Sequence, residues 1–460
     1  MGALDPLKET GYRISSWTER NIPDAWIIAL ILVLISYVMS LIWGNVDPFT
    51  SALNFGRGFF SAGILSFAMH MVWIMWTGYV IAVSPPVTRL LERLGRLPNV
   101  DKPWQTILLI ALFSMITGWL HWGFSLIGSA MLVVYLARNQ PKVHYPLMVI
   151  TAYSGLGFVW HGGFSASAPL LVATPGHLFE KVPAAKPMGV ITTDRTLFSS
   201  WNITMLIVTI VVMSLIAVAL HPRPDKVKAV SPERLEALKR WIPPPKPSQP
   251  QPFAIKMDWT PIWTVMAAAF AYTWVGWWLV TQRTLTLEVV NFAFMATGAL
   301  LHWYPRRFLE ATRDAIKATW GIILQFPFYG GILGIFQFSA LSKVFADWFV
   351  AVSTPQTYPL FAYWYAGVIN YFVPSGGSEW IIVAPYLLEA ANRLGVSYAT
   401  ITIAYAWGDM MTDIIQPFWA IPLMTIAAVE FREIAGYAFV MFLFYIVLVS
   451  IGVLLIPLNL

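Results

Sequence analysis

The chain of 460 residues contains no cysteine and few charged residues, and both absences limit what it can be. Without cysteine there are no disulfides, iron–sulfur clusters, zinc–thiolate sites or cysteine nucleophiles. Lys, Arg, Asp and Glu make up only 11% of the chain, whereas soluble domains carry roughly 25%. Hydrophobic residues make up 58%. Such a chain cannot cover a water-facing surface, so the composition predicts an all-α polytopic membrane protein with the lipid bilayer as its partner.

Apolar runs of about 20 residues, the length that spans the hydrocarbon core, recur along the chain. Two longer apolar stretches, 105–137 and 359–392, are interrupted at 118–123 and 374–377. Each predicts two half-length helices of about 15 residues that meet at a polar tip, as a re-entrant hairpin, because backbone breaks at membrane depth only where protein or water satisfies it. The remaining runs predict nine crossings, near residues 24–43, 59–83, 146–173, 198–220, 259–280, 286–304, 318–338, 398–429 and 436–457.

The loop charges support this topology. With a cytoplasmic N-terminus and both hairpins returning to their own side, the cytoplasmic segments hold 22 of the 29 Lys and Arg residues. This bias is typical of cytoplasmic loops. It also explains the net charge of +6 without a nucleic-acid partner. The expected location is the cytoplasmic (inner) membrane.

A Pro-rich basic linker at 221–258 divides the chain into halves that match weakly. TGWLHW at 117–122 aligns with AGVINY at 366–371, and SAPLLVA at 167–173 aligns with AIPLMTI at 420–426. These matches predict two repeats, 1–220 with a broken helix at 146–173 and 281–460 with a broken helix at 398–429. Because of the extra crossing at 259–280, the second repeat enters the membrane from the opposite side to the first, so the two repeats are inverted. Inverted repeats with hairpins and broken helices are typical of secondary transporters.

The tip of the second hairpin, PSGGSEW, combines a helix-ending proline with two glycines, two serines and a glutamate. It predicts a helix N-terminus at the membrane midplane, which is suited to an anion. A plain tight turn is the alternative. The first tip, which begins at His121, occupies the symmetric position.

Polar residues also interrupt the two broken helices. Asp409 and Asp413 lie four residues apart and share a helix face. Ionisable groups at this depth are expensive and usually functional, although a satisfied packing network is the alternative. No metal-binding spacing is present, so no metal site is predicted. The candidate substrate-binding residues are Trp122, Gly123, Ser125, Ser165, Ser167, Ser375, Gly376, Gly377, Ser378, Thr412 and Gln416, and the candidate ion-coupling residues are Glu379, Asp409, Asp413, His121 and His161.

Several runs, among them WHGGFSASAPLLVATPGH, NYFVPSGGSEW and WGDMMTDIIQPFWAIP, resemble the short-chain fatty acid transporter family, which includes acetoacetate and butyrate uptake carriers. The resemblance extends from about residue 14 to the last span. It implies a proton- or sodium-linked carrier of short monocarboxylates, within a wider group of elevator-type ion-coupled carriers. It also implies that Ser375, Gly376 and Gly377 are tip residues, and that the last broken helix contributes Asp409, Thr412, Gln416 and Pro417.

The chain departs from the family pattern beside these residues, and familiar relatives have non-histidine polar or small residues near His70, His121 and His161. Ser378 and Glu379 stand where the family usually has a third glycine followed by a polar or aromatic residue, and Asp413 stands where asparagine is common. These departures concern the substrate and the coupling ion more than the architecture.

The predicted function is therefore secondary active symport of a short-chain monocarboxylate with H⁺ or Na⁺, with no other cofactor. No Lys or Arg falls in either tip or either broken segment, so helix N-termini and hydroxyls must meet the substrate's charge. Glu379 is expected to bind the coupling proton and to share it with His121; alternatively, Glu379 lies in an extracellular vestibule. The chain is not expected to be an enzyme, but two other functions remain open. One is a carrier of an amino acid or hydroxy acid that uses Glu379 for an ammonium group. The other, which is less favoured, is an intramembrane enzyme built on the histidines and aspartates. The sequence leaves open whether the chain forms a homodimer or another homo-oligomer.

Overall fold

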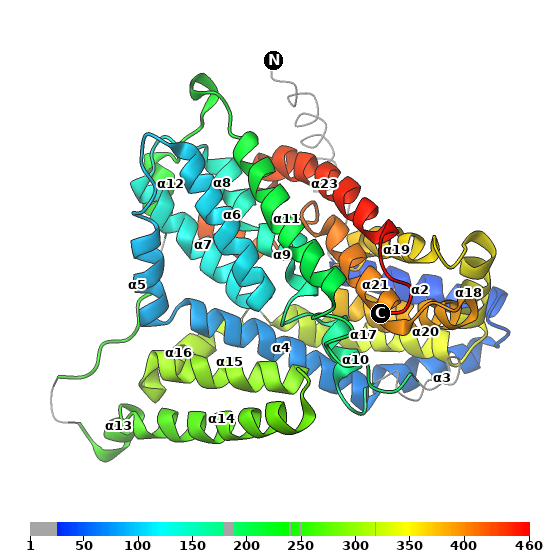
Figure 1. The fold of residues 1–460 in the computed structure, drawn as a ribbon. Coiled ribbons are helices and arrows are strands. Elements are labelled where there is room, and N and C mark those ends of the chain that lie inside the picture. Colours follow the sequence, from blue (N-terminus) through cyan, green and yellow to red (C-terminus); the bar gives the residue numbers. More distant parts are fainter. Residues whose placement is uncertain (1–24, 178–187, 239–240, 249–250, 318) are drawn as a thin grey trace.

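A computed structural model describes residues 25–177, 188–238, 241–248, 251–317 and 319–460. Within these ranges all regular secondary structure is helical, which confirms the predicted all-α fold (Figure 1). Residues 1–24, at the start of the predicted first repeat, lie outside the described part.

Five of the long apolar helices lie at predicted crossings, whereas the sixth, α6 (Pro103–Leu120), forms the first arm of the predicted hairpin at 105–137. Two shorter apolar stretches lie in α2 (Ala25–Ile42) and α15 (Leu287–His302). Six helices in the described ranges are long and apolar enough to cross a bilayer: α4 (Ala62–Ala82), α6 (Pro103–Leu120), α11 (Ser200–Ala219), α14 (Ile262–Gln282), α17 (Trp320–Gln337) and α23 (Phe431–Leu454).

Each stretch predicted as a hairpin contains two helices. The first pair, α6 and α7 (Trp122–Asn139), is separated only by His121. The second pair, α19 (Tyr358–Phe372) and α20 (Gly376–Leu394), is separated by residues 373–375. The arms have 18, 18, 15 and 19 residues, so three of them exceed the predicted length of about 15. The re-entrant path and the division into inverted repeats stay predictions.

The two broken helices differ from each other. The first consists of four short pieces: α8 (Tyr145–Ala152), α9 (Ser154–Phe158), the 3-10 turn η1 (Trp160–Gly162) and α10 (Ala168–Ala173). The second consists of α21 (Tyr398–Asp413) and α22 (Ile421–Ala427). Helix α21 continues through Asp409 and Asp413, so both lie on one helix as expected, and it ends only after Asp413.

Shorter helices that the apolar runs did not predict complete the fold. They are α3 (Pro48–Phe59), α5 (Pro85–Leu94), α16 (Pro305–Ile316) and α18 (Leu341–Val352). In the linker, η2 (Pro224–Lys226), α12 (Pro232–Ala237) and α13 (Phe253–Asp258) are short.

Helix α4 lies between two groups of helices. In Figure 1, α14, α15 and α16 lie on one side of α4, while α6 and α7 lie on the other. Helix α17 packs against α3, α4 and α20, and α19 packs against α21. The pieces η1 and α10 contact α21, and α10 also contacts α20. The tip of the second hairpin therefore meets the broken part of the first half.

Candidate functional site

The second tip presents the N-terminus of α20. Trp419 Nε1 donates to Pro374 O, and the Tyr405 hydroxyl donates to Gly376 O at 2.6 Å, so both sides of the turn are held. The first helical hydrogen bond runs from Glu379 N to Ser375 O, at 2.8 Å. The amides of residues 376–378 precede this bond, and such amides are available to an anion.

The serine at the start of this helix does not cap it with its side chain. Ser375 occupies the N-cap position, but its side chain accepts no hydrogen bond from the helix amides. Instead, Ser378 Oγ donates to Ser375 Oγ at 3.1 Å. The amides at the tip therefore keep their donor capacity for another partner.

The tip lies directly against His161 and Asp409. A Cβ atom at Gly376 would lie 2.4 Å from His161 Cε1 and 2.5 Å from Asp409 Oδ2. A Cβ atom at Gly377 would lie 2.7 Å from the Phe67 ring. Only glycine allows the backbone to approach its neighbours this closely.

His161 bonds to the second half of the chain through Nδ1 and to the first half through Nε2. Nδ1 lies 2.7 Å from Asp409 Oδ2, and Nε2 accepts from the Ala168 amide at 3.1 Å. Because an amide can only donate, Nε2 carries no proton, so Nδ1 donates to Asp409. Ser167 Oγ lies 2.9 Å from the same Nε2 and therefore also donates to it.

The order Ser167–His161–Asp409 resembles a hydrolytic triad, in which the histidine removes the proton of the serine. Here the Ala168 amide competes with Ser167 for the single lone pair of Nε2. This competition leaves the hydroxyl without a dedicated base, which argues against the enzyme alternative.

Glu379 is fully buried, so the alternative that places it in an open vestibule is wrong. Neither of its carboxyl oxygens has a hydrogen-bond partner, and Asp409 Oδ1 also has none. Asp409 and Asp413 lie close enough to Glu379 to interact with it electrostatically. Three buried acids therefore share one region of the protein.

Both carboxyl oxygens of Asp413 accept hydrogen bonds, in contrast to those of Glu379. Trp160 Nε1 donates to its Oδ2 and Asn370 Nδ2 donates to its Oδ1, both at 2.8 Å. Asn370 also donates to Thr412 Oγ1 at 3.1 Å, and Thr412 donates to Gly367 O at 2.8 Å. Asp413 and Thr412 thus fasten α21 to α19. The sequence prediction missed Asn370, although the alignment of the two halves pairs it with His121.

The first tip is built differently from the second. His121 Nδ1 accepts from the Phe124 amide at 3.1 Å, and its ring lies 4.1 Å from that of Phe294. His121 therefore caps α7, and none of its contacts is with Glu379, in contrast to the predicted sharing of a proton. Ser165 Oγ accepts from the Trp122 amide at 2.9 Å.

Two further predicted residues also serve the local backbone. Ser125 Oγ donates to Ser114 O at 2.7 Å. Gln416 Oε1 accepts from the Phe418 amide at 2.7 Å, in the break that follows α21.

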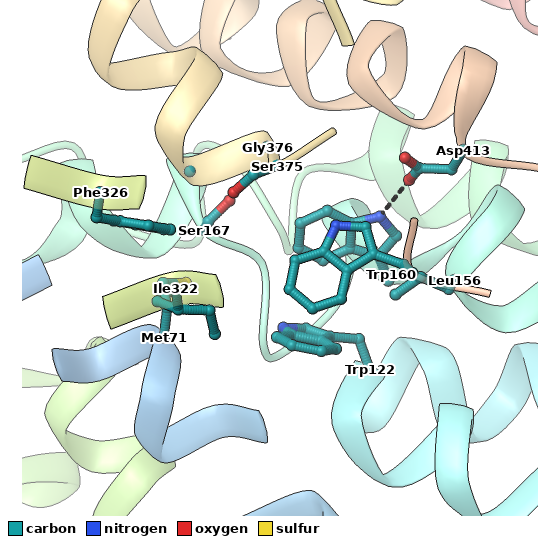
Figure 2. A pocket seen from close by; sticks show the side chains of 12 residues that line it. Met71, Trp122, Leu156, Trp160, Ser167, Ile322, Phe326, Ser375, Gly376 and Asp413 are labelled. Carbon is teal, nitrogen blue, oxygen red and sulfur yellow. Dashed lines mark hydrogen bonds between the residues drawn. The ribbon is translucent and has the colours of Figure 1, made fainter. Parts of the chain in front are cut away.

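A narrow pocket lies beside the second tip, with a cavity volume of about 30 Å³ (Figure 2). Its lining contains no Lys or Arg and is mostly apolar. In Figure 2 the hydroxyls of Ser167 and Ser375 turn toward one another at one end, and the indole of Trp122 extends into the pocket below Trp160. Trp122 Nε1 is buried and has no partner. The lining residues are Met71, Trp122, Leu156, Trp160, Ser167, Ile322, Phe326, Ser375, Gly376, Gly377, Asp413 and Trp419.

The predicted residues thus separate into groups, and their binding roles stay predictions. Trp122, Ser167, Ser375, Gly376 and Gly377 line the pocket together with Asp413. Six predicted substrate residues do not belong to its lining: Gly123, Ser125, Ser165, Ser378, Thr412 and Gln416. Among the described residues, no group of three or more His, Asp or Glu side chains is placed to hold a metal ion.

Comparison with known proteins identifies the family of the chain. The family profile described as "Short chain fatty acid transporter" matches residues 7–456. The chain belongs to the short-chain fatty acid transporter family. Two relatives carry the name "Putative short-chain fatty acid transporter". The one from Escherichia coli K12 is 33% identical over 446 residues, which cover 96% of this chain and 98% of the relative. The one from Haemophilus influenzae is 30% identical over 450 residues, which cover 95% and 97%.

Two solved transporters show more distant likeness. The YdaH transporter of Alcanivorax borkumensis has 14% sequence identity and a TM-score of 0.49, over 93% of this chain and 98% of that one. MtrF of Neisseria gonorrhoeae has 12% identity and a TM-score of 0.47, over 96% of each chain. Membership of the short-chain fatty acid transporter family makes the chain a multi-pass membrane transporter and not an enzyme.

Proposed function

We propose that the chain carries short-chain monocarboxylates, such as butyrate or acetoacetate, across the cytoplasmic membrane by symport with a proton, with its N-terminus in the cytoplasm. One observation carries this proposal. The pocket beside α20 is mostly apolar, contains no Lys or Arg, and is lined by the N-terminus of α20 and by Trp122, whose buried Nε1 has no partner. Such a site suits one carboxylate on a short alkyl chain.

The donors and the apolar wall define how the substrate is bound. The carboxylate accepts from the amides of residues 376–378, from the Ser167 hydroxyl and from Trp122 Nε1. The alkyl chain lies against Met71, Ile322 and Phe326. Each methylene that is buried there contributes about 0.8 kcal/mol. Affinity is therefore expected to rise about fourfold per carbon until the pocket is full.

Charge balance supports a coupled cation. Glu379, Asp409 and Asp413 are buried at the site, and the lining supplies no Lys or Arg to offset a substrate anion. We favour a proton because Glu379 and Asp409 are both fully buried, and one bound proton would remove one of their negative charges. The amino-acid alternative loses support because Glu379, the group expected to bind an ammonium, does not line the pocket.

We also propose an elevator movement. Hydrogen bonds join η1, α10, α20 and α21, through Tyr405 to Gly376 and through His161 to Asp409. The facing wall from α4 and α17 is apolar, and an apolar contact without hydrogen bonds slides at low cost. Cysteines placed at Gly321 on α17 and at Phe418, in the break between α21 and α22, allow a test by thiol cross-linking, because a Gly321 Cβ would lie 3.6 Å from the Phe418 ring. A short cross-link is expected to stop transport, and undiminished transport would contradict the movement.

Counterflow of labelled butyrate in liposomes tests the function itself. Acetoacetate and propionate are expected to compete, whereas succinate and alanine are not. An inward proton gradient is expected to drive accumulation and a sodium gradient is not. Absence of butyrate counterflow would overturn the substrate, and accumulation that requires sodium would overturn the coupling ion.

The Trp122 indole provides a residue-level test of the carboxylate position. Trp122→Phe keeps the ring and removes the unpaired N–H. Loss of a hydrogen bond to a charged group costs roughly 1.5–3 kcal/mol, so the Kd for butyrate is expected to rise roughly 10- to 100-fold. Trp277→Phe is the matched control, because Trp277 is 52% exposed on α14, away from the pocket. Equal Kd values for the two variants would remove Trp122 from the site.

A further inference from the structure

We propose that Ser167, His161 and Asp409 form a hydrogen-bonded relay, which links occupancy of the pocket to one proton shared by Asp409 and Glu379. This inference rests on the proposed function and assigns the coupling to particular atoms. The proton comes from solvent, binds a carboxylate oxygen and leaves again during transport, so no other bond is formed or broken.

The first step concerns the buried oxygens. Both oxygens of Glu379 and the Oδ1 atom of Asp409 have no hydrogen-bond partner, and both side chains are fully buried. A buried carboxylate without partners is expensive. One proton held between the two carboxyl groups turns an unpaired oxygen into a donor and another into its acceptor, and it removes one negative charge from the region.

The second step concerns the surroundings of Glu379. The titratable groups that interact with it are Tyr365 on α19, Tyr386 on α20, and Tyr405, Asp409 and Asp413 on α21. None of them is a cation.

The other elements packed against α20 do not change this balance. Helices α10, α17 and α19 contain no charged residue. On α18, Lys343 pairs with Asp347 at 2.8 Å, and Asp347 also bonds to Arg393 near the far end of α20. None of these groups offsets the negative charge around Glu379, so we assign its neutralisation to a proton.

The third step connects this proton to the pocket. Ser167 Oγ lines the pocket and donates to His161 Nε2, while His161 Nδ1 donates to Asp409 Oδ2. The single lone pair of Nε2 is shared with the Ala168 amide, so the Ser167 hydroxyl can turn to a ligand while Nε2 keeps one donor.

The fourth step gives the direction of the coupling. Hydrogen bonds in a chain polarise one another. When Ser167 turns to a bound carboxylate, His161 loses a donor at Nε2 and donates more weakly from Nδ1. Asp409 is then less stabilised as an anion and binds the shared proton more strongly. The substrate's own negative charge acts in the same direction, so substrate and proton bind together.

The test counts protons during binding to the purified full-length protein. Titration calorimetry with butyrate in two buffers of different ionisation enthalpy gives the number of protons taken up per substrate. The parent is expected to take up about one proton near neutral pH, as linkage requires for a shared site. Glu379→Gln is expected to take up almost none and to lose proton-driven accumulation while it keeps counterflow. Glu389→Gln, on the same helix and partly exposed, is the matched control and is expected to behave as the parent.

The relay is tested separately from the charge effect. Ser167→Ala is expected to bind butyrate more weakly and to take up clearly less than the parental number of protons, whereas Ser167→Thr retains the hydroxyl and is expected to restore the uptake. Parental uptake in Ser167→Ala would overturn the relay, and parental uptake in Glu379→Gln would overturn the shared proton. A parent that shows counterflow but requires sodium and takes up no proton would overturn both. A parent without any butyrate counterflow would instead refute the proposed function.

Discussion

Gly376 lies so close to the His161–Asp409 pair that any side chain would disturb it. The sequence placed Gly376 among the candidate substrate-binding residues of the tip. In the structure even a Cβ atom would meet His161 Cε1 at 2.4 Å and Asp409 Oδ2 at 2.5 Å. Both contacts are shorter than real carbon atoms tolerate, so the pair must separate.

Gly376→Ala is therefore expected to abolish butyrate counterflow, because it displaces His161 or Asp409 from the tip. Gly276→Ala is the control, since a Cβ at Gly276 on α14 would meet no atom within 4 Å. Counterflow in liposomes is the measurement, with thermal melting to confirm that both variants fold. Similar rates for the two variants would show that the close approach at Gly376 is not required.

Other residues show the limit of prediction from the chain alone. Ser167, His161 and Asp409 were each named from their position in polar interruptions of apolar runs. Their mutual hydrogen bonds were not foreseen, because Asp409 lies 248 residues from His161 in sequence. His121 was expected to share the coupling proton of Glu379, because it lies at the symmetric tip. In the structure its Nδ1 caps α7.

At the scale of helices, α3 and α17 approach each other through glycine. A Cβ at Gly334 would lie 2.2 Å from Asn54 O, and one at Gly58 would lie 2.1 Å from Gly330 O. Gly330 and Gly334 form a small-xxx-small pattern, which lets helix backbones pack closely in membranes. This contact fixes α17, one wall of the pocket.

Gly334→Ala is expected to destabilise the protein by about 1–3 kcal/mol, the usual cost of overpacking. Gly56→Ala, on the other face of α3, has open space around its Cβ and is expected to leave the melting temperature nearly unchanged. Thermal melting in detergent compares the two. A melting temperature of Gly334→Ala equal to that of Gly56→Ala would contradict the close contact.

The beginning of the linker is attached to α8 through histidine side chains. His221 Nε2 accepts from the His144 amide at 3.2 Å, and the Lys228 amide donates to His144 Nδ1 at 2.9 Å. Burial lowers the pKa of His221 below its usual value, and its hydrogen bond to Pro222 O opposes this shift. The attached state thus needs neutral His221, which accepts a proton less readily than a free histidine.

Acid is expected to loosen this attachment. A released His221 binds protons as the pH falls below about 6.5, whereas the attached form resists them, so the attachment is fully present above that pH and weakens below it. Hydrogen exchange at the amides of His144 and Lys228 is expected to accelerate between neutral pH and pH 5, after correction for intrinsic exchange. His221→Gln can still accept the bond but does not titrate, so its exchange is expected to change less. An equal change in both proteins would exclude His221 as the sensitive group.

At the scale of the whole molecule, the membrane topology stays a prediction that the absence of cysteine makes easy to test. Ser248→Cys, in the linker, is expected to react only from the cytoplasm. The segment before the second hairpin is predicted to lie outside, and there Gln356 is more exposed than Thr357, whose hydroxyl bonds to Thr354. Gln356→Cys is expected to react with an impermeant reagent only from outside. Labelling of both sites from one side would refute the inverted arrangement.

The homodimer or other homo-oligomer also stays a prediction at this scale. Light scattering of the purified protein, with the detergent mass subtracted, measures its assembly directly.

The sequence by itself determined the class of the molecule and the places where its helices break. Low charge and long apolar runs require a membrane protein of helices, since only internal hydrogen bonding satisfies the backbone in lipid. The breaks at His121 and at residues 373–375 fall in or beside the predicted tips because proline, glycine and polar residues act locally. The short helices α5 and α16 were missed, because they are too polar to register as apolar runs.

Only the tertiary structure decided what the tips do. It placed Gly376 against His161 and Asp409, left both oxygens of Glu379 unpaired, and turned an unpaired indole N–H of Trp122 toward the pocket. These relations join segments from opposite halves of the chain. Hydropathy and spacing describe neighbours along the sequence, whereas distances between such segments follow from how all the helices pack together.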